Sequence, residues 1–422
     1  MEDNQRGVSP RGFVMADSAV PGIIVYKPAP KKERLDMVVR FSCPQCGGET
    51  AYSVEDGGLT CAYCGYHEAP QNEVVGRQAE SFEFTVDTVE RAVNGWGAAR
   101  KGLICDACGA QISLPEGALA TSCPFCASNN VIHHRAAQDV LRPRFLIPFQ
   151  IEEVQCQEIV RDWLGDTWLV PKHLRRTAVV SNFTPMYLPY WTFASTAVAD
   201  WKAQVGRTET YRSGGKTRRR TVWRWENGTV RHDFSDLLVR GTNHVSTYLL
   251  GAVGNFELDD LVPYEAKYLA GMQAQAYEVG MEAAWQKARL SMREETKKMC
   301  RGQASTQKIR NFSMHLDFRD EAWRYILLPV YINSYRFENK PFQLLINGQS
   351  GKIAGQRPAD WRKIGLAAAG LTLPGILVFL ILLLFFPDVF GSGGGFWSLI
   401  VFVGGMLIAI AIALQAQKLD KA

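Results

Sequence analysis

The sequence predicts an α+β protein of several domains: two small four-cysteine modules, a mixed antiparallel-sheet domain with helices, and a C-terminal transmembrane helical hairpin. Three observations lead to this fold class. Two cysteine motifs with the same spacing lie in the first third of the chain, aromatic and β-branched residues alternate through its middle, and two long apolar runs without charge lie near its end. The length of 422 residues is enough for about two to four domains.

Composition and charge set broad limits on function. With 47% hydrophobic and 21% charged residues, the chain has the composition of an ordinary folded protein. A formal net charge of +5 is compatible with nucleic acid or an anionic membrane surface as a partner, and it is too small to distinguish them. Residues 1–40 have no long apolar segment behind a basic start, so we expect a flexible N-terminal arm rather than a signal peptide, and a cytosolic location for the region after this arm.

Eight of the ten cysteines form two copies of one motif. The first runs CPQCGGETAYSVEDGGLTCAYC and the second CDACGAQISLPEGALATSCPFC, and in both copies fourteen residues separate two CxxC pairs. Four thiolates at this spacing suit tetrahedral Zn²⁺, so the pattern predicts two Cys₄ zinc ribbons, at residues 41–70 and 101–134, joined by a linker at 71–100. The predicted zinc ligands are Cys43, Cys46, Cys61, Cys64, Cys105, Cys108, Cys123 and Cys126.

A Cys₄ site leaves no coordination position for water or substrate, which makes both predicted zinc ions structural rather than catalytic. Each ribbon is too short to build much of a core, so the metal would supply its folding free energy. The main alternative is that the CxxC pairs act as redox dithiols. In that case the protein would be a thiol and zinc redox sensor that loses its metal reversibly on oxidation.

The middle region, residues 135–358, has the length and pattern of an α+β cytosolic domain. Apolar residues at helical spacing predict one helix over 152–164 and a long one over 265–300. Between them, aromatic and β-branched runs broken by turn residues at 213–215 and 227–228 predict an antiparallel meander. A strand, a hairpin and a second strand are expected at the end of the domain.

One predicted strand in this meander has an unusual distribution of arginine and tryptophan. Trp223 and Trp225 share one face of the strand, and most of the arginines share the other. Such a surface can bind nucleic acid through guanidinium groups and stacking rings. The same pattern fits a half-buried strand whose tryptophans enter the core, the interpretation that we favour, or a basic face beside anionic lipid. The nucleic-acid-binding candidates are Arg218, Arg219, Arg220 and Arg224.

Two apolar runs near the C-terminus are long enough to cross a membrane. Residues 364–386 carry no charge and residues 396–414 contain a single polar serine, so each run predicts a transmembrane helix. Residues 387–395 form a short external turn, and 415–422 a cytosolic tail. Basic residues flank both outer ends of the hairpin, and the positive-inside rule places these ends in the cytoplasm. Because no ionisable residue lies within either run, we interpret the hairpin as an anchor and not as a transporter.

No spacing of catalytic residues is recognisable in the chain, and we predict that the protein is not an enzyme. Its seven histidines are scattered, without a Ser-His-Asp arrangement, a nucleophile elbow, or a phosphate-binding GxGxxG or GxxxxGK[ST] loop. Cys156 and Cys300 lie outside the cysteine motifs, and the helical pattern around Cys156 favours a buried apolar role for it.

The order of these parts resembles a family of bacterial membrane-anchored tandem zinc-ribbon proteins. The resemblance covers most of residues 41–414 and is carried by the cysteine motifs, by FLIPFQI and YLPYW, and by LLPVY with LLINGQSGKIAGQRP just before the membrane run. Such proteins often carry a TFIIB-type or primosomal-helicase-like zinc-ribbon label, although this chain has no ATP-binding loop. Some are linked to phage-shock-protein-A-type systems, and the resemblance implies that they tether that membrane-remodelling scaffold. Only the eight cysteines carry over from the family pattern, as structural zinc ligands.

The residues and the resemblance together predict a non-enzymatic adaptor in the bacterial inner (plasma) membrane, with two spans and with its N-terminus, soluble domains and C-terminus in the cytoplasm. It would recruit protein partners, including a phage-shock-protein-A-type scaffold, to the lipid bilayer in envelope stress or membrane remodelling. The alternative is a membrane-attached nucleic-acid-binding protein of a replication or primosome-like kind. The redox sensor is the second alternative.

Overall fold

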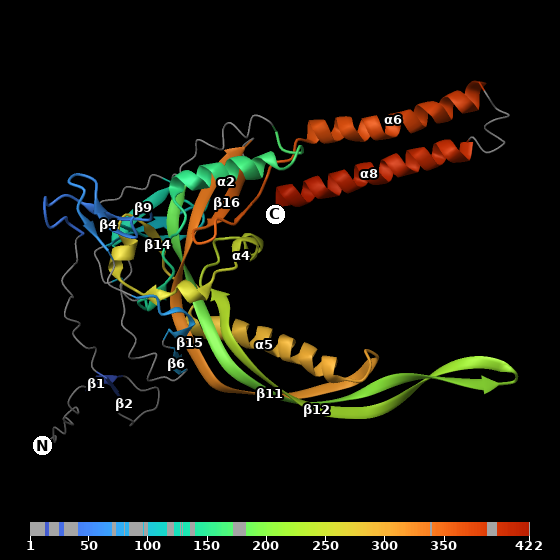
Figure 1. Cartoon of the computed structure of the whole chain (residues 1–422), viewed down its shortest axis with the longest axis horizontal. Helices are drawn as coiled ribbons and strands as arrows, with labels where there is room; N and C mark the ends of the chain where they lie inside the picture. Colours follow the sequence, from blue (N-terminus) through green and yellow to red (C-terminus); the bar gives the residue numbers. More distant parts are fainter. Residues whose placement is uncertain are drawn as a thin grey trace, which may run out of the picture. The chain divides into compact units, whose positions relative to one another are not determined.

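Two units make up the chain, Met1–Arg40 and Phe41–Ala422, in the computed structural model (Figure 1). In the first unit, β1 (Phe13–Ala16) pairs with β2 (Val25–Pro28) as an antiparallel hairpin, and the rest of the predicted arm lies outside the described residues. The residues that the structure describes are 13–16, 25–28, 41–69, 73–79, 81–83, 96, 100–115, 122–126, 128, 130–135, 140–171, 183–337, 340–385 and 395–421.

The second unit contains a twelve-stranded mixed sheet, a three-stranded sheet and helices. The strands of the large sheet are β6 (Phe82–Glu83), β7 (Arg100–Cys105), β8 (Gln111–Pro115), β9 (Val131–Arg135), β10 (Phe145–Leu146), β11 (Thr184–Ser213), β12 (Lys216–Arg240), β13 (Val262–Pro263), β14 (Gln273–Gln275), β15 (Ile309–Phe337), β16 (Lys340–Asn347) and β17 (Ile353–Gly355). Those of the small sheet are β3 (Thr50–Ser53), β4 (Gly58–Cys61) and β5 (His67–Glu68). The helices are α2 (Glu153–Gly165), α4 (Thr247–Val253), α5 (Met281–Gln303), α6 (Trp361–Phe385) and α8 (Gly395–Lys421), with short 3₁₀ turns η1 (Gly76–Gln78), η3 (Leu258–Asp260) and η4 (Ala266–Leu269).

Three long strands form the centre of the large sheet. β11 pairs antiparallel with β12 on one side, from Tyr190 opposite Arg240 to the turn, and with β15 on the other side. The turn between β11 and β12 has Gly214 and Gly215 at φ of 59° and 75°, a conformation that glycine adopts without steric cost. The meander turn predicted at 213–215 is therefore confirmed.

The turn predicted at 227–228 is wrong, because β12 continues through these residues as regular strand. Gly228 lies opposite Trp201 of β11, and a Cβ atom on it would lie 2.9 Å from the indole Nε1 of Trp201. A glycine within a strand often marks such a close approach. Here it makes room for the tryptophan, whose Nε1 donates a 2.8 Å hydrogen bond to Gln303 at the end of α5.

The long strands bend at bulges that non-glycine residues of positive φ create. Asp236, Asn311 and Asp320 have φ between 51° and 55°. Each of them lies where the pairing register shifts, opposite the stretch between Phe193 and Gln204 of β11. A bulge adds a residue to one strand and increases its twist, and asparagine and aspartate tolerate the left-handed conformation best after glycine. These bulges give the three strands the curvature visible in Figure 1.

Both faces of the central sheet are buried where residues 186–191 of β11 pair with 325–330 of β15, and alternate residues of this stretch enter different cores. Tyr187 and Trp191 of β11 join the core beneath α2 and α5, as Tyr325 of β15 does. Leu188 of β11 and Leu328 of β15 join the opposite core, which α4 and the strands β7 and β8 also line. This alternation follows from the two-residue period of a strand, and it explains why residues 186–191 of β11 and 325–332 of β15 are apolar at every position.

The helix predicted over 152–164 is confirmed as α2, in which Cys156 is fully buried. The long helix predicted over 265–300 is partly wrong. It begins only at Met281, and the preceding residues form η4 and β14. Gly271, with φ of 75°, interrupts the predicted helix. The apolar residues before Met281 therefore belong to η4 and β14 and to the turn between them. Within α5 the predicted apolar stripe is buried in the core, together with Cys300.

Candidate metal centres and membrane segment

The same backbone turn occurs at all four CxxC pairs. The N–H of the first cysteine of a pair donates to a carbonyl five residues later, as in Cys43 to Gly48 at 2.6 Å and Cys123 to Ser128 at 2.8 Å. Gly47, Gly65 and Gly109 complete three of these turns at φ of 72° to 76°, the left-handed region in which a side chain would be strained. The local sequence thus folds each pair into a knuckle that directs two sulfur atoms to one point.

The eight predicted ligands gather in two groups of four. In each group the Sγ atoms lie within 4.8 Å of one another, a distance at which four cysteines could hold one metal ion. A tetrahedral ion with metal–sulfur bonds of about 2.3 Å would place its sulfurs about 3.8 Å apart. The shortest Sγ–Sγ distances of 3.4 Å between Cys43 and Cys64 and 3.6 Å between Cys105 and Cys126 fit this geometry. All ten cysteines are free thiols.

The protonation of the cysteines also favours a cation at the first centre. Backbone N–H groups of Cys64 and Tyr63 lower the pKa of Cys61 to about 7, which favours one thiolate in the first group. The backbone of Tyr66 also favours the thiolate of Cys64, but the neighbouring thiols, Cys43 foremost, raise its pKa to about 12. Four thiolates can therefore coexist here only around a positive charge.

The second cysteine group is built into the large sheet. Its central strand β7 pairs with β8 on one side and with β9 on the other. β8 also pairs with β14, through Ile112 and Ser113. The knuckle of Cys123 is held from another direction, because the hydroxyl of Ser334 in β15 donates to the carbonyl of Pro124 at 2.6 Å. What the sequence presents as a separate module is thus an edge of the main sheet.

Arg100, at the start of β7, ties this ribbon to the core. Its guanidinium is completely buried and donates to the carbonyl oxygens of Ser113, Leu269 and Met272 at 2.8 to 3.1 Å. Burial lowers its pKa to about 10, so the group stays charged at neutral pH. Its Nε also donates to the hydroxyl of Ser113 at 2.6 Å, but the other three acceptors are backbone carbonyls, so nothing in the sequence identified Arg100.

The first cysteine group stands on the same short stretch of chain, residues 267–275, which we call the seat. The N–H of Tyr52 in β3 donates to the carbonyl of Ala270 at 3.0 Å, and the ring of Tyr52 lies 5.3 Å from that of Tyr268. Glu68 of β5 forms an ion pair with Lys267. The seat therefore contacts both ribbons and fixes one relative to the other.

The knuckles of the first ribbon point away from the seat and remain exposed. Cys46 and Cys64 are exposed, and the side chain of Tyr63, inside the second CxxC pair, is 79% exposed. In the second ribbon the corresponding position is Phe125, which is only 2% exposed because it packs in the core. The two ribbons thus differ: one supports the sheet, and the other presents a large aromatic side chain to its surroundings.

Two helices near the C-terminus, α6 and α8, are long and apolar enough to cross a membrane, with a mean hydropathy of 2.5 in each candidate span, Trp361–Phe385 and Leu399–Gln417. Most of their large apolar side chains are exposed. They pack against each other where a glycine faces the partner helix, because a Cβ atom on Gly375 would lie 2.9 Å from the Cα of Phe402. The turn predicted at 387–395 falls almost wholly outside the described residues.

The start of α6 is attached to Leu169 and Val170, a few residues after the end of α2. The N–H of Asp360 donates to the carbonyl of Leu169 at 2.8 Å, and the ammonium of Lys363 donates to the carbonyl of Val170 at 3.1 Å. Leu169 also packs with Ile364 of α6 and Ala416 of α8. These contacts connect the two apolar helices directly to the sheet domain.

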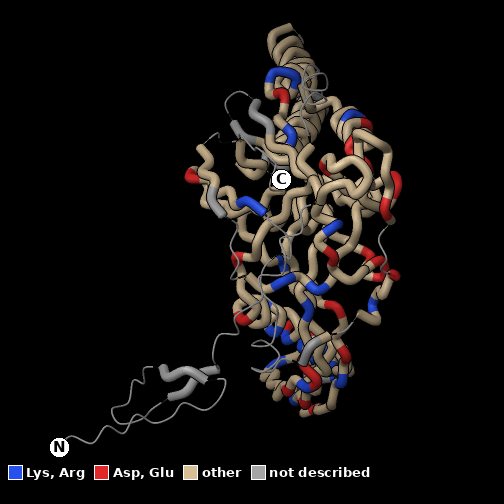
Figure 2. Tube along the Cα trace, turned by 90° about the vertical axis from the view of Figure 1, so that its left-hand side faces the viewer, with Lys and Arg blue, Asp and Glu red and all other residues tan. Residues whose placement is uncertain are grey.

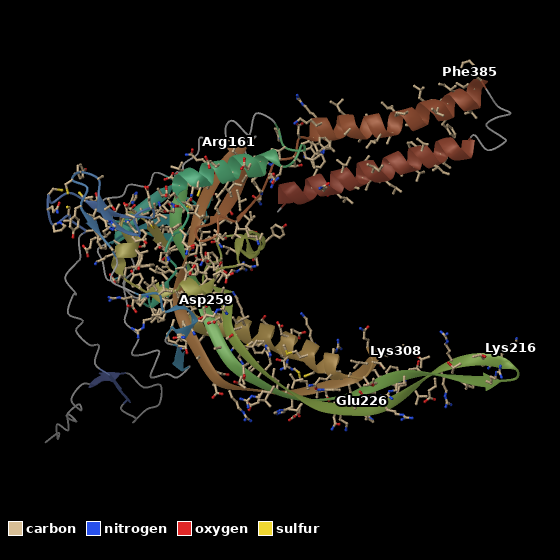
Figure 3. The ribbon with its side chains drawn as sticks, in the orientation of Figure 1. Arg161, Lys216, Glu226, Asp259, Lys308 and Phe385 are labelled. Atoms are coloured by element: carbon tan, nitrogen blue, oxygen red, sulfur yellow. The ribbon has the colours of Figure 1, made fainter. Side chains whose placement is uncertain are left out.

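The arginines proposed for nucleic acid lie on the outer part of β12, far along the strand from these centres (Figure 3). All four are exposed. Trp223 and Trp225 do not enter the core, contrary to the interpretation that we favoured. Trp225 is 53% exposed, and the ammonium of Lys202 lies 4.9 Å from the centre of its ring.

No family model matches the chain, and no solved structure matches it. Among curated proteins, the chain is similar to "Uncharacterized protein YdjG" of Bacillus subtilis (strain 168), with 24% identity over 336 residues, which are 79% of this chain and 94% of that relative. That name states no activity.

Proposed function

We propose that the protein is a non-enzymatic, membrane-anchored zinc-ribbon adaptor that recruits protein partners to the cytoplasmic face of the bacterial inner membrane. The observation that carries the proposal is the contrast between the two ribbons. One is an integral edge of the sheet, whereas the other leaves the knuckle of Tyr63 free on a rigid seat. A domain that fixes one aromatic surface in space and attaches to two apolar helices is suited to hold a partner near a bilayer.

Zinc is the metal that we assign to both centres. Four sulfur ligands in tetrahedral arrangement favour Zn²⁺ or an iron–sulfur cluster among biological metals. The near-contact of the sulfurs in each group leaves room for one ion only, which favours zinc. The first group would hold Zn²⁺ through Cys43, Cys46, Cys61 and Cys64, and the second through Cys105, Cys108, Cys123 and Cys126. Its chemistry there is structural, because each ion would be fully coordinated by the chain.

The apolar helices define the anchor. Basic residues precede α6 and end α8, so the positive-inside rule places the sheet domain and both outer ends of the hairpin in the cytoplasm. Because Leu169 and Val170, in the segment after α2, are hydrogen-bonded to the start of α6, the domain would be held close to the headgroups. Tethering raises the local concentration of a bound partner at the membrane without any chemical step.

The partner that we propose for the first ribbon is a scaffold of the phage-shock-protein-A type, acting in envelope stress or membrane remodelling. The family resemblance supports this choice. The exposed Tyr63 supports the contact surface, because an exposed large aromatic side chain is a frequent centre of protein interfaces.

An affinity purification of the detergent-solubilised chain from its own cells tests the proposal. The wild type should recover a coiled-coil membrane-stress scaffold, and Tyr63→Ala should recover about tenfold less, while its zinc content stays unchanged. Tyr248→Ala is the matched control, since that side chain is 65% exposed on α4, outside the ribbons. Equal recovery by both variants, or recovery without such a scaffold in the wild type, would contradict the adaptor function.

A further inference from the structure

The outer end of the long hairpin is a free two-stranded ribbon. β15 accompanies β11 only as far as Val205, which pairs with Ile309. The N–H of Gly206 still donates to Lys308 at 2.8 Å, and beyond it β11 and β12 continue alone to the turn beside Lys216, as Figures 1 and 3 show. We call residues 206–226 the free ribbon.

The net charge of the free ribbon is as large as that of the entire chain. It has seven basic and two acidic residues, a balance of +5 that equals the formal net charge of all 422 residues. Over the rest of the described trace, basic and acidic residues are interspersed (Figure 2). The seven basic side chains are all exposed, and six of them are arginines: Arg207, Arg212, Lys216, Arg218, Arg219, Arg220 and Arg224.

The two carboxylates of the free ribbon are already engaged. Glu209 pairs with Arg220 at 3.2 Å, and Glu226 accepts hydrogen bonds from the hydroxyl and the N–H of Ser305 and lies 3.7 Å from Arg207. Among the described residues, no carboxylate pairs with the other five cations. A surface of five uncompensated cations attracts a polyanion.

The cations lie on both faces of the ribbon. The register places Tyr211 opposite Arg218 and Glu209 opposite Arg220 on one face, and Thr210 opposite Arg219 on the other. Because side chains alternate along a strand, Arg207, Lys216 and Arg224 belong to the first face, and Arg212 belongs to the second with a row of threonines. A ribbon lying flat on a bilayer would use only one of these faces.

The tip and the tryptophans narrow the choice of polyanion further. The tip sequence SGGK contains no apolar residue that could enter a membrane interface. The guanidinium of Arg310 lies 4.2 Å from the ring centre of Trp223 and the ammonium of Lys202 lies 4.9 Å from that of Trp225, so a cation already occupies one face of each ring and a base would have only the other face for stacking. A duplex needs no stacking on side chains, and cations on both faces of the ribbon suit its two phosphate backbones.

We propose that the free ribbon binds double-stranded DNA by entering the major groove and contacting phosphates on both sides. The major groove admits a two-stranded β-ribbon, and cations on both faces would reach the phosphates of both strands. Arginine suits this role because its planar guanidinium binds phosphate oxygens in pairs. The threonine hydroxyls offer further phosphate contacts without reading the sequence, so binding is non-specific. The proposal is independent of the adaptor function.

The test uses the full chain in phosphatidylcholine nanodiscs and a fluorescent DNA duplex of about two helical turns. Binding is measured by anisotropy at several salt concentrations between about 50 and 200 mM. The wild type should show log K falling with log salt, with a slope of about −4 to −6 for five to seven phosphate contacts. Arg218→Gln/Arg219→Gln/Arg224→Gln removes three of the five uncompensated cations, from both faces, and should reduce the slope by about three and weaken binding at least tenfold.

The matched control removes the same charge from α5, as Lys287→Gln/Arg293→Gln/Lys298→Gln, where all three side chains are exposed. Unchanged binding by the control supports the proposal, and an equal loss in both triple variants overturns it. Hydrogen exchange provides the second readout. DNA should protect residues 206–226, whereas protection of these residues only on phosphatidylglycerol nanodiscs assigns the ribbon to anionic lipid and overturns the proposal.

Discussion

Arg100 and Leu269 are joined by a 3.1 Å hydrogen bond from the guanidinium Nη1 to the carbonyl oxygen, although 169 residues separate them in the chain. This bond connects the first strand of the second ribbon to the seat, on which the first ribbon also stands. The stability of the metal centres and that of the sheet are therefore linked through one buried cation.

Arg100→Met should lower the free energy of unfolding by about 3 kcal/mol or more, because it leaves buried carbonyls without donors. Lys101→Met removes the same charge from the next position of β7, where the side chain is half-buried, and should change stability by less than about 1 kcal/mol. Denaturant unfolding of the detergent-solubilised chain measures both. Equal effects of the two substitutions would show that Arg100 does not tie the ribbon to the core.

Gly228→Ala should destabilise the protein by about 1–3 kcal/mol. The new methyl group would lie 2.9 Å from both Trp201 Nε1 and the Gln303 Oε1 that it bonds, so one of them must move. Gly251→Ala in α4 is the control with the opposite sign. A Cβ atom there meets nothing within 4 Å, and alanine is the better helix former, so this variant should gain up to about 1 kcal/mol. If Gly228→Ala and Gly251→Ala have the same free energy of unfolding, the close approach at Gly228 does not contribute to stability.

The difference between local and distant information explains what the sequence could predict. Each CxxC knuckle is a short turn whose two ligands are close in the chain, and a glycine follows three of the four pairs, so the spacing indicated both cysteine groups. The two apolar helices are equally local. The union of the second ribbon with the large sheet depends on backbone pairing of β8 with β14, which leaves no motif.

The predictions that are wrong depend on contacts between residues distant in the chain. Gly228 resembles a turn residue until its neighbour Trp201 on the other strand is known. The apolar residues before Met281 have helical spacing, but Gly271 breaks the helix and β14 joins the sheet. The exposure of Tyr63, compared with the burial of Phe125 at the matching position, depends on which ribbon the core covers.

Trp168 and Trp361 should lie at the membrane–water interface if α6 and α8 span the bilayer. They are 51% and 49% exposed, and the contact of Leu169 with Ile364 holds them near the start of α6. In vesicles with lipids brominated near the headgroups, Trp168→Phe and Trp361→Phe should each reduce the quenched part of the tryptophan fluorescence.

Trp225→Phe is the control for this experiment, because its indole is equally exposed, at 53%, but lies on the free ribbon. Its loss should leave the quenched part unchanged. Quenching that is insensitive to both Trp168→Phe and Trp361→Phe would mean that this end of the domain does not touch the membrane.

The metal content of the chain, purified without added metal, decides whether the two cysteine groups are zinc sites. We predict two zinc ions and no iron per wild-type chain. Cys43→Ser/Cys46→Ser should retain one zinc and a stable sheet, because β3–β5 form a sheet of their own. Cys105→Ser/Cys108→Ser should also lower Tm by about 10 °C, because β7–β9 belong to the large sheet. Iron in place of zinc, or a zinc content that neither pair of substitutions lowers, would show that the two cysteine groups are not zinc sites.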